Sequence, residues 1–143
     1  MNTLVKTPAW FYILAAIALV WNAMGIFAYL STVMMSAEDF AKTPEAMQNL
    51  QNATPAWAMA AFATAVFAGT LGCLLLLLKK KLAFIFLFVS LIAVILQMGN
   101  FIFLMNGFDV VSQSDKIMTY MIIVVAFLLV WFAKFSDTKR WLK

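Results

Sequence analysis

Side-chain amides interrupt two apolar stretches of this 143-residue chain. Asn22 follows Trp21 in "LVWNAMG", and Gln97 and Asn100 lie together in "VILQMGNFIFL". An amide both donates and accepts hydrogen bonds, and burying it without a partner is costly. Two uses are therefore open. The amides can bind one another or main-chain carbonyls and hold helices together, or they can line a pathway for a neutral polar solute, with Trp21 as a flat apolar wall.

The residues needed for most catalytic chemistry are missing from the sequence. It contains no histidine and one cysteine, Cys73 in "GTLGCLLLLL", which we expect to be buried as a small apolar residue. Cys/His metal sites and imidazole acid–base catalysis are thereby disfavoured. The apolar stretches also lack a carboxylate that could relay a proton or bind a coupling sodium ion. We therefore predict no catalytic residue, metal or cofactor, and a protein that is not an enzyme.

The composition places these amides in a membrane. Hydrophobic residues make up 66% of the chain, charged residues 11%, and the mean hydropathy is +0.98, whereas a soluble domain has about 25% charged residues. Apolar segments occupy residues 10–30, 55–78, 82–105 and 117–135, each close to the roughly 20 residues that cross a bilayer as a helix. We predict one all-α domain over residues 1–143, a four-helix transmembrane bundle whose main partner is the lipid bilayer.

The connections contain signals for helix ends and turns. "KKK" at 79–81 predicts a tight helical hairpin, and residues 31–54 are long enough for one or two short surface helices. Asn106 before Gly107 predicts a turn after the third span. The residues expected to cap helix N-termini are Ser36, Thr43, Thr54 and Ser112.

Lysine and arginine are distributed unevenly between the two ends of the predicted bundle. One end carries Lys6, Lys79, Lys80, Lys81, Lys134, Lys139, Arg140 and Lys143; the other carries only Lys42 and Lys116. The positive-inside rule then places both termini in the cytoplasm and the connection 31–54 outside. Topology and anionic lipid headgroups account for the positive charge, so we predict no nucleic-acid partner.

Small residues on the second span predict close helix packing. Ala61, Ala65, Gly69 and Cys73 recur every four residues, and Gly72 adds to the same narrow region. The segments "MGIFAYL" (24–30) and "MGNFIFL" (98–104) share Met, Gly, Phe and Leu, which adds Gly25 and Gly99 to the candidate packing positions. The shared pattern fits either two tandem helical hairpins, forming a parallel repeat, or chance similarity between apolar segments.

The stretches "LVWNAMGIFAYL" and "TPAWAMAAFATAVFAGTLGCLLLLLKKKLA" resemble a group of small bacterial four-helix inner-membrane proteins. The resemblance lies in Trp-Asn-x-x-Gly, in Pro-x-Trp at the start of the second span, and in Gly-x-x-Gly before a leucine run and a basic turn, and it covers nearly the whole chain. It implies a bacterial cytoplasmic membrane, and some members carry the label "sugar transporter" without an established mechanism.

Two functions are consistent with these observations. In the first, Trp21, Asn22, Gln97 and Asn100 form a site that transports or senses a neutral polar solute such as a sugar or polyol. Because a bundle of this size has little interior, transport would use a homo-oligomer, with the small-residue ridge or the Asn22 face at its interface. In the second, the chain is a non-transporting structural or accessory subunit, which packs with a partner or with itself through its small residues and its acidic outer connection.

Overall fold

The computed structural model describes residues 6–109 and 111–143, and these form helices joined by short connections. Four of the helices are long and apolar enough to cross a membrane, which confirms the predicted four-helix membrane architecture. The spanning helices are α1 (Ala9–Val33), α4 (Ala56–Leu77), α5 (Leu82–Gly99), which continues as the π-helix η1 (Asn100–Leu104), and α6 (Gln113–Thr138). The connections contain α2 (Ala37–Ala41), α3 (Glu45–Ala53) and the 3-10 turn η2 (Gly107–Asp109).

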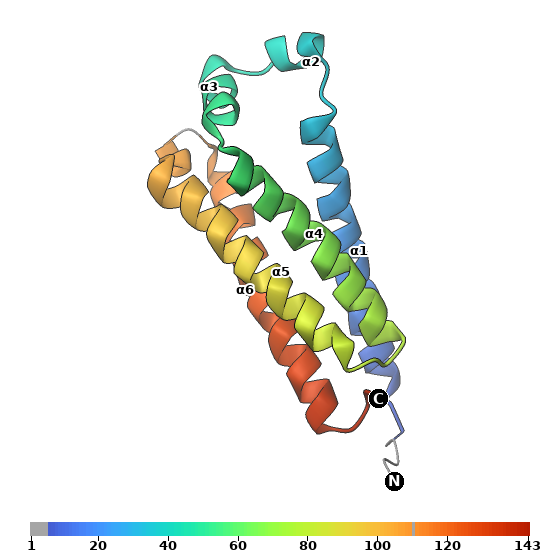
Figure 1. Cartoon of the computed structure of the whole chain (residues 1–143). Coiled ribbons are helices and arrows are strands. Elements are labelled where there is room, and N and C mark those ends of the chain that lie inside the picture. Colours follow the sequence, from blue (N-terminus) through green and yellow to red (C-terminus); the bar gives the residue numbers. More distant parts are fainter. Residues whose placement is uncertain (1–5, 110) are drawn as a thin grey trace.

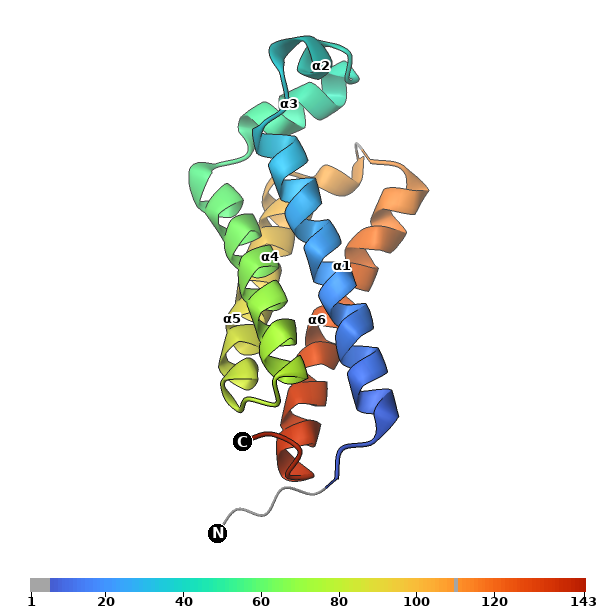
Figure 2. The ribbon, with the colours of Figure 1, turned by 90° about the vertical axis from the view of Figure 1, so that its right-hand side faces the viewer.

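The spanning helices are arranged around a central hairpin. α4 and α5 form the most extensive contact, α1 packs on α4, and α6 packs on α5 (Figure 1). α1 and α6 approach each other mainly where α1 begins and α6 ends, through ring contacts such as Trp10 with Phe132 at 6.2 Å between centroids. Toward the other end they diverge (Figure 2). The bundle is therefore closed at one end and open between α1 and α6 at the other.

Small residues explain how closely α4 packs on its neighbours. A Cβ built on Gly72 would lie 2.6 Å from Leu87 Cγ of α5, and one on Gly25 of α1 would lie 2.9 Å from Val66 Cγ1 of α4. Ala65 and Gly69 are buried as well. The small-residue ridge is thus occupied by contacts inside one chain, which leaves little of it for the oligomer interface we had expected.

Two of the residues assigned to packing differ in their surroundings. Ala61 is half-buried. Gly99 is not at a close contact, because a Cβ built on it meets no atom within 4 Å. The structure therefore shows no close packing of Gly99 within the chain, even though its sequence pattern matches that around Gly25.

Two of the four predicted N-terminal caps are confirmed. The hydroxyl oxygens of Ser36 and Ser112 accept hydrogen bonds from the main-chain N–H groups of Asp39 and Asp115. The prediction was wrong for Thr43 and Thr54, which each precede a proline: Pro44 and Pro55 occupy the cap positions, with extended backbones. The two threonine hydroxyls instead donate to the carbonyls of Phe40 and Leu50, in the helix that precedes each of them.

Three helix C-termini end in a left-handed residue that is not glycine. Lys79, Asn106 and Arg140 have φ angles of 57°, 50° and 61°, and Asn106 thereby confirms the predicted turn. After α6, the N–H groups of Arg140 and Trp141 donate to the carbonyls of Asp137 and Ser136, which is the Schellman arrangement. A cation at this position also interacts favourably with the negative end of the helix dipole.

The last residues of the chain fold back under the bundle. Trp141 and Leu142 are only 6% and 1% exposed. The Lys143 N–H donates to the carbonyl of Lys79 at 2.7 Å, and the Lys81 N–H donates to the carbonyl of Lys143 at 2.9 Å. This C-terminal segment joins the end of α6 to the α4–α5 turn, a contact that the sequence did not predict.

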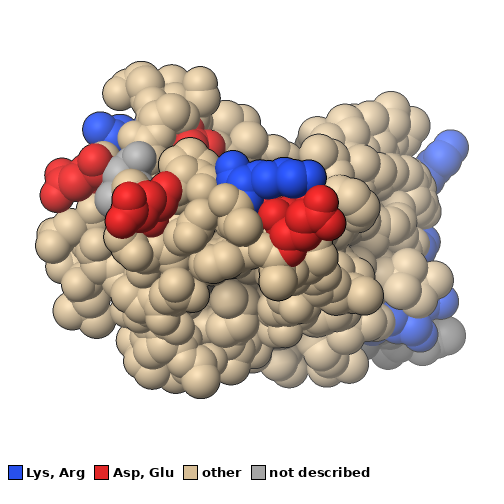
Figure 3. All heavy atoms as spheres, turned by 90° about the horizontal axis from the view of Figure 1, so that it is seen from above, with Lys and Arg blue, Asp and Glu red and all other residues tan. Residues whose placement is uncertain are grey.

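Charge separates the two ends of the molecule. The end that carries α2 and α3 presents most of the carboxylates (Figure 3), from Glu38, Asp39, Glu45, Asp109 and Asp115. At the opposite end the carboxylate of Asp137 lies 3.6 Å from Lys81 Nζ. We refer to these ends as the acidic end and the basic end.

Candidate functional site

A cavity of about 350 Å³ lies between the diverging parts of α1 and α6, with α4 and α5 behind it. Its polar lining residues are Asn22, Ser90 and Gln97. Its other lining residues are apolar or glycine and include Trp21, Met24, Phe62, Met98 and Met118. The volume is near the lower limit of the range for small-molecule sites, about 300–1,000 Å³. The structure thus brings together three of the four predicted site residues, Trp21, Asn22 and Gln97.

Asn22 forms part of the wall of the cavity and holds α1 against α4. Its Nδ2 donates to the carbonyl of Ala18 at 2.9 Å, one turn earlier in α1, and lies 3.4 Å from the Cys73 sulfur of α4. Its Oδ1 occupies the space where a side chain on Gly69 would begin, so a larger residue there would force the Asn22 amide to move. Cys73 is fully buried, as predicted. Asn22 therefore combines a packing role with a place on the cavity surface.

Ser90 is a polar lining residue that our sequence analysis missed. Its hydroxyl donates to the carbonyl of Ala65 at 2.7 Å and so joins α5 to α4 across the back of the cavity. Its Oγ also faces Gly69, at 3.1 Å from a Cβ built there. The available signal was a single hydroxyl within the apolar run 82–96.

Gln97 differs from the other two polar residues. It is half-buried on α5, and within the described residues its amide has no hydrogen-bond partner, whereas Asn22 and Ser90 bond to main-chain carbonyls. Its donors and acceptor are therefore free at the cavity surface. Ligand pockets are mostly apolar and contain a few polar groups that fix the orientation of the ligand, and the Gln97 amide is a group of this kind.

Asn100 lies apart from this cavity. It begins the π-helix η1, is buried, and its Nδ2 lies 3.0 Å from the sulfur of Met105. Gln97 lines the cavity and Asn100, three residues later, does not. No hydrogen bond joins Asn22 to Gln97 or Asn100 in the ranges that the structure describes.

The two ends of the gap between α1 and α6 differ. At the basic end it is closed by a cluster of rings, which we call the aromatic cluster: Trp10, Phe11, Phe132, Phe135 and Trp141. At the cavity, Met24 and Met118 are 63% and 47% exposed on the surface of the spanning helices. The cavity thus borders the surface that faces lipid, and the aromatic cluster lies beyond it at the basic end.

The cavity offers hydrogen bonding and apolar contact, and none of its described lining residues is ionisable. Within residues 6–109 and 111–143, no three His, Cys, Asp or Glu side chains are close enough together to hold a metal ion. We found no family model, no curated protein and no solved structure that matches this chain. The resemblance to small bacterial membrane proteins accordingly stays a prediction.

Proposed function

We propose that this protein is a small integral membrane protein that binds a neutral, mainly apolar molecule in the cavity between α1 and α6. The observation that carries the proposal is the free amide of Gln97 on the wall of a mainly apolar cavity. A ligand with one hydrogen-bonding group would satisfy this amide, and Trp21 and the lining methionines would contact the rest of it. Such a ligand reaches the site through the bilayer, because the cavity borders the lipid-facing surface.

The lining favours such a ligand over a sugar or polyol, the solutes suggested by the sequence. Asn22 Nδ2 and Ser90 Oγ already donate to main-chain carbonyls. A sugar would therefore bury several hydroxyl groups opposite apolar side chains, and each unpaired group costs about 1–3 kcal/mol. The aromatic cluster at the basic end also favours binding or sensing over a permanently open pathway.

The distribution of charge supports an orientation with the basic end in the cytoplasm. The first described residues, the last turn of α6 with the C-terminal segment, and the α4–α5 turn lie at this end (Figure 1), and eight lysine and arginine residues belong to these segments. The positive-inside rule then puts α2 and α3 on the outer side of a bacterial cytoplasmic membrane.

Photolabelling with a diazirine-bearing aliphatic alcohol tests the proposed site. In liposomes, we expect saturable labelling of the α1 and α6 segments that line the cavity, located by peptide mass spectrometry and reduced by unlabelled octanol. Phe103 and Leu104, 78% and 71% exposed, provide the internal control, because lipid-facing positions label in proportion to concentration. Gln97→Leu removes the hydrogen bond, worth about 0.5–1.5 kcal/mol, and should weaken labelling about two- to tenfold.

Two results would count against the proposed binding function. Labelling of α1 and α6 that does not saturate would mean that the cavity is only part of the lipid surface. Uptake of sugars or polyols into protein-containing liposomes, lost in Gln97→Leu but insensitive to octanol, would instead favour the polar-solute hypothesis.

An accessory-subunit function is the second candidate, favoured by one observation. α2 and α3 contain no buried residue. The apolar side chains of Phe40 and Leu50 on these two helices are therefore partly exposed and available for a contact with a partner. A photocrosslinker at Met47, which is 36% exposed, should capture a defined protein in cells if this segment contacts a partner. Crosslinks to lipid alone would contradict that function.

A further inference from the structure

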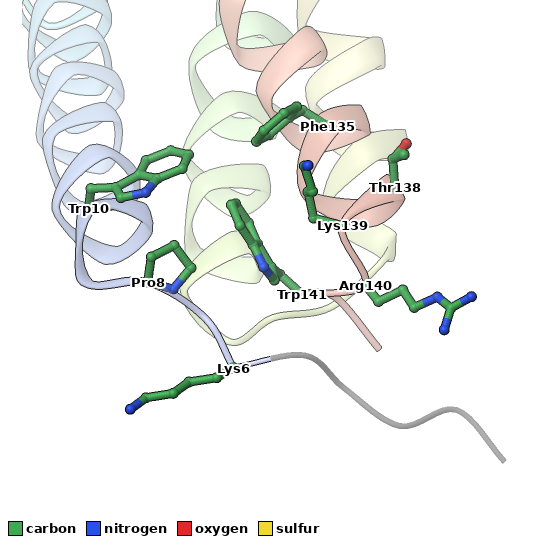
Figure 4. A pocket seen from close by; sticks show the side chains of 8 residues that line it. All are labelled: Lys6, Pro8, Trp10, Phe135, Thr138, Lys139, Arg140 and Trp141. Atoms are coloured by element: carbon green, nitrogen blue, oxygen red, sulfur yellow. The ribbon is translucent and has the colours of Figure 1, made fainter.

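A second hollow, distinct from the proposed ligand cavity, lies at the basic end between the start of α1 and the end of α6 (Figure 4). It measures about 680 Å³ and opens outward. We call it the basic hollow; its lining includes Lys6, Trp10, Thr138, Lys139, Arg140 and Trp141. We propose that the basic hollow binds the phosphate of an anionic phospholipid, a site that goes beyond the function proposed above.

The charges around the basic hollow favour an anion. Lys6 and Arg140 lie on opposite sides of its rim, and both side chains point outward from the hollow (Figure 4). Lys139 Nζ lies 5.5 Å from the centroid of the Phe135 ring. Among the described residues that line the hollow, none carries a carboxylate. Asp137 lies 3.6 Å from Lys81 and is thereby partly neutralised. Three cationic residues, Lys6, Lys139 and Arg140, thus belong to the described lining of the hollow, with no carboxylate among them.

Arg140 is held at the rim by an uncommon backbone conformation. It is the left-handed residue of the Schellman turn after α6, at φ 61°, where glycine is the usual residue because any side chain is strained there. The turn fixes the base of the arginine side chain beside Lys139, and a guanidinium binds phosphate through two parallel hydrogen bonds.

Aromatic rings connect the hollow with the hydrocarbon region, which favours a lipid over free phosphate. Phe135 lines the hollow and lies 5.2 Å from Trp131, one turn further into the span, between ring centroids. Trp131 is 60% exposed on the bundle surface. Trp10 and Trp141 form the inner wall, edge to face at 5.3 Å. An acyl chain can therefore run along Phe135 and Trp131 while its phosphate stays among the cations.

Native mass spectrometry of the full-length protein in neutral detergent micelles tests this site. We expect phosphatidylglycerol to bind more tightly than phosphatidylcholine, and Lys139→Gln/Arg140→Gln to lose about fivefold in phosphatidylglycerol affinity for each cation removed. Lys79→Gln/Lys80→Gln is the matched control, because it removes the same charge from the same end but outside the hollow. At 0.15 M salt, charges are screened over about 8 Å, so the control variant should lose less than twofold in phosphatidylglycerol affinity.

Arg140→Gly separates binding from folding. Glycine relieves the left-handed strain, so the melting temperature of the variant should equal or exceed that of the wild type. The affinity of the variant for phosphatidylglycerol should still fall about fivefold, because the variant lacks the Arg140 charge. If Lys139→Gln/Arg140→Gln and Lys79→Gln/Lys80→Gln lost equal phosphatidylglycerol affinity, the proposal would be overturned, because equal losses would indicate a diffuse electrostatic effect. Unchanged affinity in Lys139→Gln/Arg140→Gln would overturn it too. Competition by millimolar inorganic phosphate would show a free-anion site instead of a lipid site.

Discussion

Replacing Gly72 with alanine is expected to destabilise the bundle by about 1–3 kcal/mol, the usual cost of adding a methyl group to a well-packed contact. The new Cβ would lie 2.6 Å from Leu87 Cγ and 3.2 Å from the Leu87 main-chain nitrogen. The first contact cannot be relieved by moving only the tip of a side chain, and the second involves the backbone. α4 and α5 must therefore separate, which weakens the central hairpin. Unfolding in mixed micelles, followed by circular dichroism, measures the effect.

Gly99→Ala is the matched control for this prediction. It adds the same methyl group to a helical glycine of α5 where no atom lies within 4 Å, so stability should be unchanged or slightly higher, as helix propensity favours alanine. The double variant Gly72→Ala/Leu87→Ala should be more stable than the sum of the two single effects predicts, since the colliding atoms are removed. Equal destabilisation by Gly72→Ala and Gly99→Ala would contradict the proposed contact.

Replacing Trp141 with alanine is the second change with a large expected effect, about 3–5 kcal/mol, as for other buried aromatic residues. The Trp141 ring is edge to face with Trp10, Phe11 and Phe135, at 5.3, 5.7 and 5.6 Å between centroids. Without it the C-terminal segment loses its main contact under the bundle, and α1 loses one of its few attachments to α6. The expected results are a lower melting temperature and faster hydrogen exchange at the Lys81 amide, which bonds to the Lys143 carbonyl.

Trp57→Ala provides the comparison for Trp141. Trp57 lies in the first turn of α4 at the acidic end and is 49% exposed, so its removal should cost much less than that of Trp141. If both substitutions had the same small effect, the C-terminal segment would not hold the basic end together.

The same residues show which parts of the structure could be predicted. Caps at Ser36 and Ser112 were predictable because the hydrogen bond joins residues three apart in sequence. The caps at Thr43 and Thr54 were not, because each hydroxyl had a competing acceptor in the preceding helix. The burial of Cys73 was also predictable, because a small apolar side chain in a leucine-rich span is easily covered by a neighbouring helix.

The sequence by itself determined that this protein has four apolar helices able to cross a membrane, with a charge difference between their ends. These properties depend on local composition and on the requirement that a backbone in lipid satisfies its own hydrogen bonds. The tertiary structure decided which polar groups meet. Helix rotation and crossing placed Asn22, Ser90 and Gln97 around one cavity, and Asn100, at the start of the π-helix, lies outside it. The tertiary structure also brought Trp141 into contact with Trp10, which lies near the opposite end of the chain. Contacts between such distant segments depend on how whole helices pack.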